Sequence, residues 1–193
     1  MRFHPKFVAF LAVAIVATTP LGAADLIRRD RRDANKADAE RRAEKPAETP
    51  KAPARVDVVK DVAYRDDKYA DKAKHRLDLY LPKGVKRFPV VFFVHGGSWK
   101  SGDKDEYPKL GELFANEGIG AVIISYRLSP KVHHPSHIED VASAFAWTHK
   151  NIVKHGGRRD RIFAVGHSAG GHLVSLLATD EKYLDKEGLR TSD

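Results

Sequence analysis

From residue 56 onwards, the sequence predicts an α/β fold with a mainly parallel sheet and helices on both faces. Apolar runs of strand length alternate with segments whose apolar residues recur at helical spacing. Such alternation favours parallel strands, because each helix carries the chain back across the sheet before the next strand begins. One apolar run also leads directly into a glycine-rich turn that contains a serine. Open sheets of this kind bind ligands beyond the carboxyl ends of their strands.

Two strands are expected to open the sheet as an antiparallel hairpin. Residues 56–64 and 76–81 alternate or cluster apolar side chains, and the charged residues 65–74 separate them as a turn. Residues 89–94 and 121–126 are apolar runs of strand length, and they are expected to form the third and fourth strands. The parallel part of the sheet is therefore expected to follow the hairpin.

Two amphipathic helices are predicted between the third strand and the serine-bearing turn. Leu110, Leu113 and Phe114 stand at i, i+3 and i+4, so residues 106–117 are expected to form a helix with one apolar face. Residues 138–152 repeat apolar side chains at similar spacing, and the glycine pair that follows them is a typical helix stop. Helices in these two places separate successive strands, as an α/β fold requires.

The serine-bearing turn has the pattern of a nucleophile elbow around Ser168. Residues 161–165 form a short apolar run, a Gly-x-Ser-x-Gly pentapeptide follows it, and residues 172–178 continue at helical spacing. In such an elbow the serine takes a strained conformation that exposes its hydroxyl, while Gly166 and Gly170 keep neighbouring side chains away. The alternative is a glycine-rich turn with an incidental serine. The order of strand, turn and helix favours the elbow.

A second motif, about 70 residues upstream, predicts an oxyanion hole. The third expected strand runs straight into His95-Gly96-Gly97, and glycines after a strand let backbone N–H groups point into a cleft. The expected donors are the N–H groups of Gly96 and Gly97, joined by that of Ala169 just after the serine. His95 is expected to hold the loop rather than to act as a base. Alone, this motif is also compatible with an ordinary glycine turn.

Together these motifs resemble the α/β-hydrolase superfamily. The resemblance is closest to its carboxylesterase branch, which is related to hormone-sensitive lipase and to bacterial feruloyl, acetyl-xylan and kynurenine-formamidase-like esterases. It covers the chain from about residue 56 onwards. At residue 98 hormone-sensitive-lipase-like members usually have a third glycine, whereas this chain has serine, which is closer to the formamidase-like and feruloyl-esterase-like relatives. Four stretches carry the resemblance: Leu77-Asp78-Leu79-Tyr80-Leu81-Pro82, His95-Gly96-Gly97-Ser98-Trp99, Tyr126-Arg127-Leu128-Ser129-Pro130, and Gly166-His167-Ser168-Ala169-Gly170-Gly171-His172.

The resemblance implies a serine hydrolase that acts on carboxylic esters without a cofactor. Ser168 would be the nucleophile, and a histidine and an acid that follow it in the superfamily's chain order would activate it. Only 25 residues follow Ser168. We therefore expect the chain to be the N-terminal part of a longer hydrolase, truncated after the elbow and its helix, with the triad acid and base missing. A catalytically inactive remnant and an amidase or formamidase of the same fold are the alternatives.

Several other polar residues have structural interpretations. Asp140 precedes Ser168, so it does not fit the superfamily's order for the triad acid, and we expect it to pair with Arg127. His133, His134 and His137 cluster before the second helix, but no carboxylate or cysteine stands at the spacing of a closed metal site. No metal site is therefore expected there.

The N-terminal region is expected to be a signal peptide followed by a linker. Residues 1–24 combine early basic residues, an apolar stretch of about 12 residues and small residues for cleavage. That stretch is shorter than the roughly 20 residues of a membrane span, so export to the periplasm or the extracellular space is expected, with no stable span after cleavage. Residues 25–55 are charged, lack apolar periodicity and are expected to be a disordered linker, which leaves residues 56–193 as the hydrolase portion. The chain has no cysteine, and hence no disulfide.

The net charge of +8 resides largely outside the hydrolase portion. Residues 25–55 alone contain ten Lys and Arg against seven Asp and Glu, with both signs interleaved. Nucleic-acid binding requires a basic face on the folded part, so this distribution argues against it. The expected partner is a small-molecule ester or an ester linked to a polysaccharide.

Overall fold

The computed structural model describes residues 56–190 of the 193-residue chain. The predicted signal peptide (residues 1–24) and charged linker (residues 25–55) lie outside the described residues, as do residues 191–193. These two assignments therefore stay predictions.

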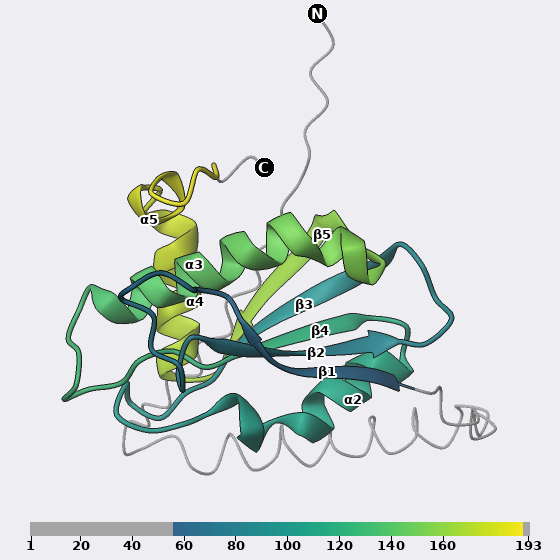
Figure 1. The fold of residues 1–193 in the computed structure, drawn as a ribbon, viewed down its shortest axis with the longest axis horizontal. Coiled ribbons are helices and arrows are strands. Elements are labelled where there is room, and N and C mark those ends of the chain that lie inside the picture. The colour runs from purple at the N-terminus through teal and green to yellow at the C-terminus, as the bar shows by residue number, and fades with distance from the viewer. Residues whose placement is uncertain (1–55, 191–193) are drawn as a thin grey trace, which may run out of the picture. The chain divides into compact units, whose positions relative to one another are not determined.

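A five-stranded sheet in the order β1-β2-β4-β3-β5 forms the centre of the described part (Figure 1). β1 (Val56–Ala63) and β2 (Arg76–Pro82) form the predicted antiparallel hairpin. β2 is also antiparallel to β4 (Gly120–Ile124), whereas β3 (Phe88–Val94) is parallel to both β4 and β5 (Gly157–Gly166). Only β2 therefore runs against the other four strands of this sheet, which confirms the predicted, mainly parallel α/β architecture.

Helices cover both faces of the sheet, as the sequence predicts. α2 (Pro108–Asn116) contacts β1, β2 and β4 on one face. α3 (Ser136–Asn151) and α4 (Ala169–Thr179) pack against each other and against β3 and β5 on the opposite face. In Figure 1, α2 and α3 lie on opposite sides of the strands.

Alternating side chains of the strands supply both cores. Phe92 is buried in the larger cluster beneath α3 and α4, and its neighbour Phe93 is buried in the smaller cluster beneath α2. Successive residues of a strand point to opposite faces, so the continuous apolar run of β3 fills both cores.

The charged segment after α4 contains a short helix that its sequence does not indicate. Residues Lys182–Asp185 form a short helix, α5, and Tyr183 and Leu184 are buried in the larger core. The sequence does not indicate this helix, because its two apolar residues are adjacent and lie among charged residues, so they do not establish a helical period.

A buried lysine ties the start of the sheet to the loop that follows β3. Lys104 begins the short 3-10 helix η1 (Lys104–Glu106), and its side chain is only 3% exposed. Its Nζ lies 2.8 Å from a carboxylate oxygen of Asp61, 3.1 Å from one of Asp78 and 2.8 Å from one of Asp105. Burial alone would lower the pKa of Lys104, but the hydrogen bonds to these carboxylates raise it, so the lysine stays charged.

Candidate active site

Ser168 occupies a strained turn between β5 and α4. Its φ of 52° and ψ of −118° lie in a region that side-chain-bearing residues rarely adopt, and such strain costs about 1–3 kcal/mol. The serine is exposed, although the next residue, Ala169, is buried and begins the helix. The turn therefore presents the hydroxyl-bearing residue at the carboxyl end of a sheet strand, as a nucleophile elbow does.

Two glycines allow this turn because their neighbours leave no space for a side chain. A Cβ added to Gly166 would lie 2.3 Å from the carbonyl carbon and oxygen of Gly170. A Cβ added to Gly170 would lie 2.1 Å from the backbone oxygen of Val94, at the end of β3. The first and last residues of the pentapeptide are thus glycine because backbone atoms pass directly beside them.

The elbow lies directly against the predicted oxyanion loop. The backbone N–H of His167 donates to the carbonyl of Val94 at 3.1 Å, which ties the turn to the end of β3. A Cβ added to Gly96 would lie 3.1 Å from the Cβ of Ser168. The fold therefore brings together two motifs that are about 70 residues apart in the sequence.

His95 is fully buried, and its ring holds the backbone of the loop. Its Nδ1 lies 2.7 Å from the carbonyl oxygen of Gly96, to which it donates. Within the described residues, its Nε2 has no hydrogen-bond partner. Burial lowers the pKa of His95, and the bond to Gly96 only partly opposes this, so the imidazole is neutral near pH 7. A buried donor of this kind suits a structural role better than that of a base.

The loop continues through three residues with positive φ: Gly97 (103°), Ser98 (53°) and Trp99 (61°). The backbone N–H groups of Lys100 and Ser101 both donate to the carbonyl of Gly97, at 2.9 and 3.0 Å. These two bonds close the loop into a tight turn directly after the predicted oxyanion donors.

The structure adds Tyr107, which the sequence did not indicate, to this loop. Burial raises the pKa of the Tyr107 hydroxyl, and a hydrogen bond from the backbone N–H of Gly96 opposes the rise. One of the three expected oxyanion donors therefore faces a tyrosine hydroxyl. The Tyr107 ring is held in turn by Phe93, with ring centroids 4.8 Å apart.

Trp99 lies beside the first turn of the serine's helix. Its ring meets the His172 ring edge-on, with centroids 5.4 Å apart, and the tryptophan remains 37% exposed. Its backbone carbonyl accepts a hydrogen bond of 2.8 Å from the N–H of Ser129. Trp99 is thus anchored through its backbone and presents its indole to solvent next to the elbow.

Asp140 is fully buried and forms the predicted pair with Arg127. The Arg127 side chain donates to it from Nη2 at 2.7 Å and from Nε at 2.9 Å, and the Arg127 backbone N–H donates at 2.9 Å. The structure adds His75, whose Nε2 lies 3.1 Å from an Asp140 oxygen. The ring's Nδ1 accepts from a backbone N–H, so the proton on Nε2 faces Asp140. The Asp140 carboxylate therefore has a structural role, because it links α3 to the residues that flank β2 and β4.

The three clustered histidines do not converge. His133 and His134 are exposed, whereas His137 is buried with its Nε2 3.2 Å from the hydroxyl of Ser129. In residues 56–190, no group of three or more His, Cys, Asp or Glu side chains is placed to hold a metal ion. None of the helices in the same residues is long and apolar enough to cross a membrane.

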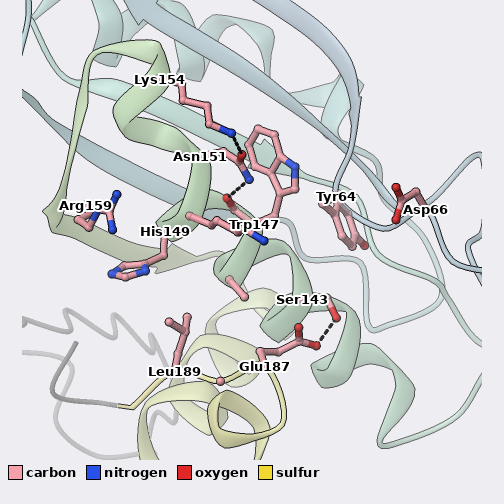
Figure 2. A pocket seen from close by; sticks show the side chains of 13 residues that line it. Tyr64, Asp66, Ser143, Trp147, His149, Asn151, Lys154, Arg159, Glu187 and Leu189 are labelled. Carbon is pink, nitrogen blue, oxygen red and sulfur yellow. Dashed lines mark hydrogen bonds between the residues drawn. The ribbon is translucent and has the colours of Figure 1, made fainter.

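A cavity of about 700 Å³ lies apart from the serine (Figure 2). Helix α3, the turn that follows it, the start of β5 and the segments after β1 and α5 line it, with Trp147, Lys154, Arg159 and Glu187 among its side chains. Neither the elbow nor the oxyanion loop contributes a residue to this cavity.

The comparisons with known proteins agree with this geometry. The BD-FAE family model matches residues 77–191, which is more than half of the chain. The chain belongs to the BD-FAE family. Relatives that it matches are named esterases and carboxylic ester hydrolases, and solved esterase structures share its fold, which confirms the α/β-hydrolase resemblance seen in its motifs.

Two curated relatives of this BD-FAE chain illustrate the match. A probable isoprenylcysteine alpha-carbonyl methylesterase of Oryza sativa subsp. japonica is 39% identical over 110 residues, which cover 55% of this chain and 25% of the relative. Esterase LipC of Mycobacterium tuberculosis is 39% identical over 122 residues, which cover 60% of this chain and 30% of LipC. The chain thus spans less than a third of the length of either relative.

Solved structures share the fold. Esterase B of Lactobacillus rhamnosis has a TM-score of 0.63 at 24% identity, covering 89% of this chain and 55% of that one. A bifunctional GH43-CE protein of Bacteroides eggerthii has a TM-score of 0.58 at 31% identity, covering 64% of this chain and 17% of that one.

Proposed function

We propose that this chain carries the nucleophile and the oxyanion hole of a serine esterase. The observation that supports it most directly is the strained, exposed Ser168 lying against the Gly96 loop, where a Cβ added to Gly96 would lie 3.1 Å from the Cβ of Ser168. An exposed serine beside backbone donors is the arrangement that acyl transfer requires.

In the proposed reaction, the Ser168 hydroxyl oxygen attacks the carbonyl carbon of the ester. The negative charge that develops on the carbonyl oxygen is stabilised by the N–H groups of Gly96, Gly97 and Ala169. Collapse of the intermediate expels the alcohol and leaves an acyl-serine, which water then hydrolyses to the acid and free serine.

A base must remove the serine's proton during the attack. His95 is buried and donates to the Gly96 carbonyl, and Asp140 is bound to Arg127, so neither is placed for this task. We propose that a histidine and a carboxylate outside the described residues supply the base and its orienting acid. The relatives are much longer than this chain, which leaves room for such groups.

The proposed substrate is a small carboxylic ester, either free or linked to a polysaccharide. The names of the relatives, which include a methylesterase and a carboxylic ester hydrolase, support the ester class. Trp99 stands beside the elbow with its indole partly exposed, where it would contact the acyl or alcohol group of a bound ester.

A Ser168→Ala variant tests the nucleophile. The 193-residue chain is expected to form one covalent adduct with a fluorophosphonate reagent, and Ser168→Ala is expected to form none, as measured by intact-protein mass spectrometry. Any hydrolysis of p-nitrophenyl acetate by the chain should fall to background in the variant, because the substitution removes the attacking hydroxyl.

Ser175→Ala is the matched control, because Ser175 lies on the same helix outside the elbow. It should keep both the adduct and the turnover of the parent. An adduct on another residue would refute Ser168 as the nucleophile. Turnover by the parent no higher than that of Ser168→Ala would instead favour an inactive remnant.

We also propose that residues 1–24 direct export to the periplasm or beyond. The basic start, the apolar stretch and the small residues before residue 25 support this assignment. Expressed with its own N-terminus in a Gram-negative host, the mature protein is expected in the periplasmic fraction, beginning near residue 25 by N-terminal sequencing. Val13→Arg, which interrupts the apolar stretch, should keep the protein in the cytoplasm at full length. Cytoplasmic, uncleaved parent protein would contradict export.

A further inference from the structure

Two peptide groups of the oxyanion loop have N–H groups that are expected to donate to the oxyanion. The carbonyl groups of the same two peptides accept hydrogen bonds that hold the loop. A peptide unit is planar, and in its trans form the C=O and N–H groups point in opposite directions. A hydrogen bond to the carbonyl therefore also sets the direction of the N–H. The carbonyl of His95 belongs to the same peptide as the N–H of Gly96, and the carbonyl of Gly96 to the same peptide as the N–H of Gly97.

Tyr126 holds the first of these peptides directly. It follows β4, is fully buried, and donates from its hydroxyl to the carbonyl oxygen of His95 at 3.1 Å. Burial raises the pKa of the Tyr126 hydroxyl well above its ordinary value, so the group stays protonated and remains a donor. This bond fixes the direction of the Gly96 N–H.

Tyr126 holds the second peptide through the ring of His95. The two rings are stacked, with centroids 4.4 Å apart and planes 14° from parallel. The stacked imidazole donates from Nδ1 to the Gly96 carbonyl at 2.7 Å. Within the described residues, its Nε2 makes no hydrogen bond, so the Nδ1 bond and the stacking set the orientation of the ring. The direction of the Gly97 N–H thus also depends on Tyr126.

We propose that Tyr126 is a positioning residue that orients two consecutive oxyanion donors, one through its hydroxyl and one through its ring. This inference rests on the proposed function, in which the Gly96 and Gly97 N–H groups stabilise the oxyanion. The backbone geometry itself is independent of catalysis, and it can be measured without turnover.

Tyr126→Phe removes the hydroxyl and keeps the ring, so it separates the two contributions. In the ¹⁵N-labelled 193-residue chain, the Gly96 amide is expected to exchange its hydrogen about tenfold faster in the variant, as for the loss of one hydrogen bond. The Gly97 amide should change less, because the stacked ring remains. Tyr126→Leu, which also removes the stacking, should accelerate exchange at both amides.

Tyr64→Phe is the matched control. Tyr64 is also buried, and its hydroxyl donates to the backbone carbonyl of Ser125 at 2.9 Å, next to Tyr126 in sequence but outside the loop. This variant should leave exchange at Gly96 and Gly97 unchanged. The proposal would be overturned if the Gly96 amide exchanged at an unchanged rate in Tyr126→Phe. It would also be overturned if amides throughout β3 and β4 exchanged faster by the same factor, because Tyr126 would then only contribute to core packing.

Turnover provides a second, separable readout. In the Ser168-dependent hydrolysis of p-nitrophenyl acetate, Tyr126→Phe should lower kcat by about tenfold with little change in KM, because a misaligned donor weakens binding of the oxyanion more than of the ester. A rise in KM with unchanged kcat would contradict positioning. Absence of Ser168-dependent turnover in the parent would count against the proposed function alone, and the exchange rates would still decide the role of Tyr126.

Discussion

Gly170→Ala is expected to lower the free energy of unfolding by at least about 3 kcal/mol, which is a large effect for one added methyl group. The new Cβ would lie 2.1 Å from the carbonyl oxygen of Val94 and 2.5 Å from that of His95. Both atoms belong to the backbone at the end of β3, so they cannot rotate aside as a side chain would. The elbow, β3 and the oxyanion loop must therefore separate to accept the methyl group. Urea unfolding followed by circular dichroism measures the change.

The neighbouring Gly171→Ala is the control for this prediction. Both glycines lie in α4, where alanine is intrinsically favoured over glycine by about 1 kcal/mol. A Cβ on Gly171 would lie 3.2 Å from the carbonyl oxygen of Gly166, a far less severe approach than at Gly170. Gly171→Ala should thus stay close to the parent in stability. Equal stability of the two variants would show that the close approach at Gly170 relaxes without cost.

Asp140→Asn is expected to lower the free energy of unfolding by about 3–5 kcal/mol at pH 7, the range for breaking a buried ion pair. The variant keeps the size of the side chain but loses its charge and replaces one acceptor oxygen with an NH₂ donor. That donor would face the side chain of Arg127, which already donates at this site, or the Nε2 of His75, which lies 3.1 Å from an Asp140 oxygen. Two buried donors would then oppose each other, and the guanidinium would lose its counterion.

The destabilisation by Asp140→Asn should depend on pH. Burial alone would raise the pKa of Asp140, but hydrogen bonds from His75 and Arg127 outweigh it and lower the pKa below 3.8. A carboxyl whose pKa is lowered by folding stabilises the protein above its unfolded pKa, and this contribution disappears as the pH falls through the folded value. The difference between parent and variant should therefore be full at pH 6–7 and narrow below about pH 4.

Urea unfolding at a series of pH values tests this dependence. Asp160→Asn is the control, because Asp160 pairs with Arg158 at the surface, where solvent screens the interaction. It should have little effect at any pH in the series. A destabilisation by Asp140→Asn that is constant between pH 3 and pH 7 would show that lost packing, rather than lost charge, is responsible.

Much of the fold could be predicted because apolar periodicity is strong in this chain. The strand ends of the hairpin and of β3 lie within a residue or two of their predicted positions. β5 was predicted as residues 161–165 but begins at Gly157, because pairing of Phe88 with Gly157 extends a strand whose first residues are charged. α5 was missed for the related reason that its two buried residues are flanked by charges. In both places tertiary contacts outweigh local composition.

The side chains that support the candidate site were harder to predict. Ser168, Gly96 and Gly97 stand in recognisable glycine motifs, and the Asp140 pair with Arg127 was expected and is present. His75, Lys104 and Tyr107 carry no comparable signal, and Tyr126 stands in one of the four resemblance stretches without any sign of its contact with the loop. Each is a single polar or aromatic residue whose partner is distant in the chain, and its contact exists only after the strands have assembled.

Local sequence was therefore enough to establish the α/β architecture and the serine-bearing turn of this BD-FAE family member. A strand, a tight turn and a helix are specified by neighbouring residues, through hydrophobic period and through the need for glycine where backbones touch. The arrangement of Ser168 against the Gly96 loop, and the hold of Tyr126 on that loop, arise from the pairing of β3 with β4 and β5. Hydrogen bonds between distant segments depend on sheet order and register, and no short stretch of the chain encodes those.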